Sequence, residues 1–189
     1  ANISLGQASR AFKLEEESAA TLEKYKVKES GFGRSLLMAK RLVKFGAKFI
    51  TINNGGWDMH QQIAEGFNNR GPELDYGLST LISDLDSSGM LKDTMVIVTS
   101  EFSRTKQNRD MGRDHNPGNC CLMIAGHNYD GKIIGKTSED GLTSIDNIYT
   151  PDDLCWTIGN HFGISKDYTL VDFQKRPRHL FKTEAKIIG

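Results

Sequence analysis

A run of apolar and β-branched residues, Thr94–Val98, constrains the fold of this chain more than any other segment. It lies between Asp93 and a polar stretch, as a strand buried on both faces of a sheet does. A carboxylate, Glu101, follows shortly after its end. In open α/β sheets, ligands and metal ions bind at the carboxyl ends of the strands. The segment therefore predicts a buried strand that leads into a binding site.

The other apolar patterns predict helices that alternate with strands. The predicted helices cover residues 33–45, residues 61–89 with a break near Gly71-Pro72, and a segment that starts at Thr150-Pro151 and ends at about Phe162. The predicted strands cover residues 48–53, 94–100, 119–125 and, as a short edge strand, 132–136. Such alternation implies right-handed crossovers. The sequence therefore predicts an α/β fold with a mostly parallel sheet flanked by helices, small enough to be a partial domain.

Charge and hydropathy argue against several classes of partner. The chain has 24 basic and 24 acidic residues, so its zero net charge gives no support for binding to nucleic acid or to an acidic membrane. No stretch approaches the ~20 apolar residues that span a bilayer, and no secretory signal is present. The three cysteines lie in apolar runs without a CxxC pair, which predicts buried free thiols rather than a zinc–thiolate site.

The first candidate site residues are Asp58 and His60, which follow the Gly55-Gly56 pair after the predicted strand 48–53. An aspartate and a histidine two positions apart in a loop can ligate one divalent ion through oxygen and nitrogen. The alternative is that Asp58 caps the helix predicted from residue 61 and that His60 is an ordinary surface residue.

A second group lies in the polar segment 101–118, which the sequence predicts to be a loop. Loops this long are uncommon unless they are functional or disordered. His115 suits a metal ligand, with Asp114 as a co-ligand or as an orienting group behind it. Glu101 needs a partner, either a metal ion or one of Arg104 and Arg113.

The same segment is basic although the chain as a whole is neutral. Arg104, Lys106, Arg109 and Arg113 all fall within it. An arginine beside a metal ion suits bidentate binding of phosphate or sulfate. The chain has no phosphate-binding GxxxxGK[ST] loop, no GxGxxG fingerprint and no GxSxG nucleophile elbow, so the usual nucleotide-binding and hydrolase motifs are missing.

Three motifs resemble, in order and spacing, those of the bacterial family called domain of unknown function 1501. They are Gly55-Gly-Trp-Asp-Met-His60, Ser100-Glu-Phe-Ser-Arg-Thr105 and Gly112-Arg-Asp-His-Asn-Pro117, against the usual forms GGWDTH, GEFGRTP and GRDHWP. The resemblance covers about residues 30–170. The departures, at Met59, Ser103, Lys106 and Asn116, leave every candidate ligand in place.

That family is grouped with sulfatases, so the resemblance implies an alkaline phosphatase-like fold. The composition of residues 1–30 predicts a polar helical lead-in, and the resemblance implies that residues 31–189 are the C-terminal half of the domain. The catalytic nucleophile would then lie outside this chain. In the superfamily's strand-end pattern TLVIVTSDHGE, Glu101 stands at the Asp and Phe102 at the His. The resemblance also implies export to the periplasm or the extracellular space.

Two functions follow from these residues and the resemblance. The first is a metal-dependent hydrolase of phosphate or sulfate esters, acting on an anionic small molecule or a glycan ester with zinc, calcium, magnesium or manganese. The second is a non-catalytic exported binding or surface-assembly protein, which the loss of the superfamily histidine at Phe102 favours. The candidate metal ligands are Asp58, His60, Glu101, Asp114 and His115, and the candidate anion-binding residues are Arg104 and Arg113.

Overall fold

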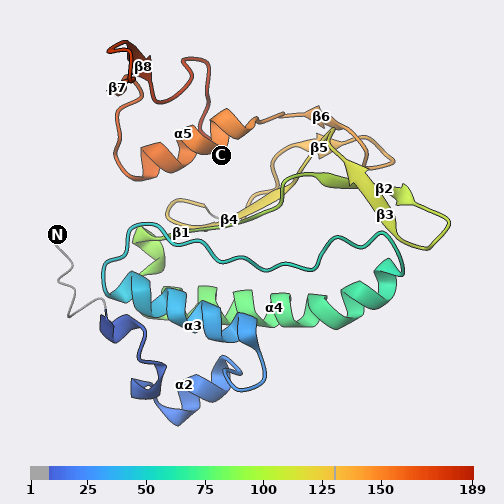
Figure 1. Cartoon of the computed structure of the whole chain (residues 1–189), viewed down its shortest axis with the longest axis vertical. Helices are drawn as coiled ribbons and strands as arrows, with labels where there is room; N and C mark the ends of the chain where they lie inside the picture. Colours follow the sequence, from blue (N-terminus) through green and yellow to red (C-terminus); the bar gives the residue numbers. More distant parts are fainter. Residues whose placement is uncertain (1–8, 130) are drawn as a thin grey trace. The chain divides into compact units, whose positions relative to one another are not determined.

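The computed structural model describes residues 9–129 and 131–189, and the chain divides after residue 130 into two compact units. The first unit contains η1 (Leu14–Glu16), α2 (Ala19–Lys24), α3 (Gly31–Lys44), α4 (Ile63–Ser87), η2 (Leu91–Asp93), β1 (Met95–Thr99), β2 (Ser103–Gln107), β3 (Arg113–Asn116) and β4 (Leu122–Gly126) (Figure 1). The second contains β5 (Lys136–Thr137), β6 (Ser144–Asp146), α5 (Pro151–His161), β7 (Thr169–Val171) and β8 (Pro177–His179).

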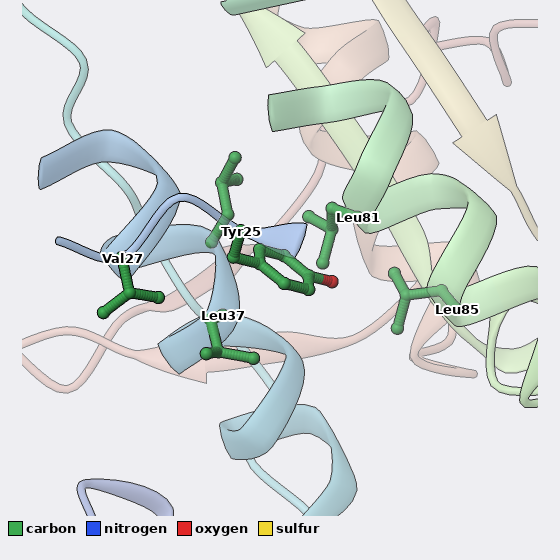
Figure 2. Packing of buried hydrophobic residues seen from close by; sticks show 6 residues of the cluster. Tyr25, Val27, Leu37, Leu81 and Leu85 are labelled. Carbon is green, nitrogen blue, oxygen red and sulfur yellow. The ribbon is translucent and has the colours of Figure 1, made fainter. Parts of the chain in front are cut away.

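The core of the first unit lies where α3 packs alongside α4 (Figure 1). Leu37 of α3 and Leu81 and Leu85 of α4 are all buried. Figure 2 shows the Tyr25 ring, from the connection between α2 and α3, reaching toward Leu81 and Leu85. The leucine spacing that predicted these two helices is therefore the spacing that builds their contact.

One carboxylate is buried at the edge of this core. Asp84 of α4 accepts hydrogen bonds from Lys24, from Lys40 at 2.7 Å and from the Tyr25 hydroxyl at 3.0 Å. Burial raises the pKa of Asp84, but these hydrogen bonds outweigh burial, so the pKa lies below its ordinary value. The ionised carboxylate thus ties α4 to both α2 and α3.

The long helix α4 continues through Pro72, where the sequence predicted a break. Proline has no N–H, so the carbonyl of Asn68 loses its usual intrahelical partner. The buried residues of α4 all follow Pro72, starting with Gly77, and their packing holds the C-terminal part in place. None of the described helices combines the length and the hydropathy needed to cross a membrane, as predicted.

The fold class predicted from the sequence is wrong. Two of the predicted strands, 94–100 and 119–125, pair with each other as β1 and β4, but they run antiparallel, with Ile97 opposite Ile124. Within the described residues every sheet is a two-stranded antiparallel ladder, so there is no mostly parallel sheet flanked by helices and no alkaline phosphatase-like fold. The connection from β1 to β4 holds the β2–β3 hairpin instead of a crossover helix. A parallel pair needs such a crossover.

Two further segments differ from the prediction. Residues 48–53 form no strand in the described structure: Phe49 is exposed, while Ile52 packs on the core between α3 and α4. Strand propensity describes residues that fit a half-buried surface, and here the helices supply that surface. Conversely, the segment 101–118, predicted as a loop, contains the β2–β3 hairpin.

The second unit confirms the helix start predicted at Thr150. Its side chain accepts from the Asp153 N–H at 3.4 Å, and the Asp153 carboxylate accepts from the Thr150 N–H at 2.6 Å, which completes a capping box. Trp156 of α5 packs edge-on against Phe181 with ring centroids 5.0 Å apart. The predicted edge strand 132–136 is reduced to β5, which starts only at Lys136. All three cysteines are exposed free thiols, contrary to the prediction.

Replacing Thr150 with Ala should lower the free energy of unfolding by about 1 kcal/mol, because the first turn of α5 loses its cap. A shift of the urea midpoint, with an unchanged dependence of the unfolding free energy on urea concentration, measures this loss. The matched control is Thr183→Ala, an exposed threonine of the same unit, which should change stability by less than ~0.5 kcal/mol. Equal stability of the two variants would show that the Thr150 side chain does not stabilise the start of α5.

Candidate functional site

Two segments of the first unit bring histidines and carboxylates together: the loop before α4 and strand β3. Asp58 and His60 come from the loop and His115 from the strand. Oδ1 of Asp58 lies 3.1 Å from Nε2 of His60 and 2.9 Å from Nε2 of His115, and the two Nε2 atoms are 3.1 Å apart. The three donor atoms thus form a nearly equilateral triangle at the protein surface.

Backbone contacts between the loop and the hairpin hold this triangle. The N–H of Arg113 donates to the carbonyl of Met59 at 3.0 Å, and the N–H of Ile63 donates to the carbonyl of Met111 at 2.9 Å. The Met59 side chain is buried, with its sulfur against Gly66 of α4. The side chains on either side of it, those of Asp58 and His60, are exposed beside the hairpin.

Gly112 lets the hairpin approach the loop closely. A Cβ at this position would lie 1.9 Å from the carbonyl carbon of His60 and 2.2 Å from the backbone nitrogen of Gln61. Both are backbone atoms, which cannot turn aside as a flexible side chain can. A glycine is therefore required where β3 begins, and the family motif starts at this residue.

The His60 ring is oriented by Asp114, the residue before His115 on β3. Oδ1 of Asp114 lies 2.8 Å from Nδ1 of His60. This hydrogen bond is the main cause that lowers the pKa of Asp114. In the tautomer that carries the ring proton on Nδ1, this nitrogen donates to Asp114 and the lone pair of Nε2 faces Asp58 and His115. Of the two roles predicted for Asp114, the geometry matches the orienting one.

Arg104 pairs with Asp58. Its guanidinium is 2.6 Å from Oδ1 of Asp58 and also donates to the carbonyl of Arg113 at 3.2 Å. Hydrogen bonds from His115 and then from Arg104 lower the pKa of Asp58 to about 2, so this carboxylate is ionised at neutral pH. Arg104 was predicted to bind an anion, and the structure places it on this carboxylate. Arg113 is exposed at the start of β3.

Glu101 does not join the triangle. Among the described residues the group of close donor atoms consists of Asp58, His60 and His115, while Glu101 is exposed after the end of β1. The prediction placed Glu101 beside Asp58 at one edge of a parallel sheet, and that sheet is not formed. The next residue, Phe102, packs its ring against the His115 ring with centroids 4.4 Å apart.

The sequence interpretation missed two residues of the hairpin. Thr105 of β2 accepts a hydrogen bond from the N–H of Asp114 at 3.0 Å. Asn108, in the turn, donates to the carbonyl of His60 at 3.0 Å and to Oδ1 of Asp114 at 3.3 Å. Asparagine, aspartate and glycine favour turns, so Asn108, Asp110 and Gly112 could have indicated this hairpin.

The comparisons with known proteins give one match. No curated protein and no solved structure matches the chain. A family profile described as "Protein of unknown function (DUF1501)" matches residues 2–189. Since this match spans nearly the whole sequence, the family resemblance of the three motifs is confirmed, and the chain belongs to the DUF1501 family.

Proposed function

We propose that Asp58, His60 and His115 bind one divalent metal ion. The observation that carries the proposal is the triangle of donor atoms with sides of 2.9–3.1 Å. At usual bond lengths of about 2.0–2.2 Å, one ion reaches all three atoms. Two imidazole nitrogens and one carboxylate oxygen suit zinc, whereas calcium, magnesium and manganese prefer oxygen ligands. Zinc is therefore the best fit among the four ions considered.

We further propose that the site serves the hydrolysis of phosphate or sulfate esters, the sulfatase-like chemistry that the motif resemblance implies. Three protein ligands leave a position for substrate or water, as in catalytic zinc sites. A bound ion would polarise an oxygen of the ester. Arg109 and Arg113 are exposed on the same hairpin that carries His115, and their charges favour an anionic substrate.

The chain's own side chains prepare the site for this role. Asp114 lies at hydrogen-bond distance from Nδ1 of His60, which suits the tautomer whose Nε2 can act as a ligand. Arg104 lies against Asp58 at the rim of the triangle, where its charge favours an incoming anion as well as the carboxylate. Phe102 covers one side of the His115 ring and limits its rotation.

A second candidate is a non-catalytic exported protein that uses the same site for binding or surface assembly. Two observations favour it. The guanidinium of Arg104 is already engaged by Asp58 and by the Arg113 carbonyl. Phe102 stands where the superfamily pattern has a histidine, and an aromatic ring cannot ligate a metal ion.

Titration of the metal-free protein with zinc tests the site. We expect one ion per chain, and the variants Asp58→Asn and His115→Ala should lose more affinity than the ~10–100-fold typical for loss of an outer-shell partner. The matched control is His179→Ala, an exposed histidine of β8, which should bind as the wild type does. Absence of binding by the wild type, or an equal loss in His179→Ala, would refute the metal site.

Turnover by the zinc-loaded protein separates the two candidate functions. Hydrolysis of an aryl phosphate or an aryl sulfate that disappears in His115→Ala supports the hydrolase. Zinc binding that matches the expectation, with no turnover of either ester, supports the binding protein instead.

A further inference from the structure

We propose that Asn108 is a positioning residue that prepares His60 for metal binding, by fixing both its backbone and its imidazole tautomer. The inference rests on the proposed metal site. Asn108 lies in the turn between β2 and β3 and does not contact the triangle of donor atoms itself. Its effect would pass through His60 and Asp114.

The side-chain amide of Asn108 makes hydrogen bonds through both its oxygen and its nitrogen. On the side of the turn, Oδ1 accepts from the N–H of Asp110 at 3.1 Å and from the N–H of Gly112 at 2.9 Å. On the side of the site, Nδ2 donates to the carbonyl of His60 at 3.0 Å and to Oδ1 of Asp114 at 3.3 Å. One side chain thus shapes the turn and joins it to the loop that carries His60.

These contacts need an amide. A primary amide offers an oxygen acceptor and two N–H donors in one plane, and both donors of Asn108 find acceptors at the site. The bond to Asp114 is important because the same carboxylate oxygen also faces Nδ1 of His60. Held between two donors, Asp114 stays an acceptor toward His60 and keeps the proton on Nδ1. Nε2 is then unprotonated, as metal ligation requires.

Two substitutions separate the contacts of the amide oxygen from those of the amide nitrogen. Asn108→Asp keeps the size of the side chain and the acceptor for the turn, but it places a carboxylate oxygen against the carbonyl of His60 and the carboxylate of Asp114. Asn108→Ala removes the hydrogen bonds of both the oxygen and the nitrogen. A negative charge added near a cation site should by itself strengthen metal binding. Weaker binding in Asn108→Asp would therefore report lost positioning and not electrostatics.

The test combines zinc titration with long-range nitrogen–proton NMR of the His60 ring in the metal-free protein. We expect the wild type to carry the proton on Nδ1. In Asn108→Asp we expect the proton to shift toward Nε2 and zinc affinity to fall by about 10–100-fold. Asn69→Asp, the same change at an exposed position of α4, is the matched control and should leave the tautomer and the affinity unchanged.

The outcomes distinguish this inference from the metal site on which it rests. Unchanged tautomer and affinity in Asn108→Asp, with a wild type that binds zinc, would overturn the role of Asn108 and leave the site intact. If the wild type fails to bind zinc, the metal site is refuted, and an unchanged tautomer in Asn108→Asp would overturn the orienting role as well. If Asn108→Ala does not fold, the comparison with Asn108→Asp still decides.

Discussion

Replacing Asp84 with Asn is expected to lower the free energy of unfolding by roughly 3 kcal/mol, near the lower end of the range for breaking a buried ion pair. The substitution keeps the shape of the side chain but removes the charge that Lys24 and Lys40 share. Lys40 is mostly buried, so its ammonium would lose a partner without gaining full hydration. A shift of the urea midpoint with an unchanged slope measures the loss.

Asp86→Asn is the matched control for this variant, because it makes the same change at an exposed position of the same helix. It should alter stability by less than ~0.5 kcal/mol. Tyr25→Phe removes only one of the three hydrogen bonds to Asp84 and should cost about 1 kcal/mol. If Asp84→Asn is no less stable than Asp86→Asn, the ion pairs contribute nothing to the fold.

The loss caused by Asp84→Asn should also depend on pH. The pKa of Asp84 is lower in the folded protein than in the unfolded chain, so its contribution is complete above the ordinary aspartate value of about 3.9. It disappears as the pH falls through the depressed folded pKa. Wild type and variant should therefore differ at neutral pH and converge in strong acid. A difference that grows on acidification would contradict the direction of this shift.

Replacing Gly112 with Ala should disrupt the site more than any single side-chain deletion in the hairpin. The new methyl group would overlap the backbone of His60 and Gln61, so the hairpin and the loop must separate. That separation breaks the bond from the Arg113 N–H to the Met59 carbonyl and moves His115 away from His60. We expect zinc affinity to fall by about 100-fold or more and stability by about 1–3 kcal/mol.

The matched control is Gly31→Ala, at the start of α3, where the added methyl group meets open space. Alanine is the better helix former, so this variant should lose no stability and should bind zinc normally. Thermal or urea unfolding and zinc titration of both variants give the comparison. Wild-type zinc affinity in Gly112→Ala would show that the close approach of hairpin and loop does not hold the site.

The sequence predicted the helices well because their signals are local. Leucine spacing located α3 and α4, and Thr150 with Asp153 marked the start of α5. The strands were located less well because pairing is not a local property. The apolar runs of β1 and β4 were recognised, but their direction depends on the connection between them, which contains a hairpin that was predicted as a loop.

The site was predicted only in part, because it too depends on contacts that are not local in the sequence. Asp58, His60 and His115 were named from residue type and motif, and they do converge, although the argument used a parallel sheet that does not exist. Glu101 was included because of that sheet, and it falls outside the group. Asn108 was missed because its role depends on the turn geometry that brings its amide to His60.

The proline inside α4 has a consequence for how the site moves. Pro72 interrupts the ladder of backbone hydrogen bonds and separates the first turns, which hold no buried residue, from the buried part that starts at Gly77. Local opening is least costly where few apolar side chains are buried. The first half of α4 should therefore fray and exchange its amide protons at a free energy well below that of global unfolding. The loop that carries His60 leads directly into this half, so the site adjoins the part of α4 that opens most easily.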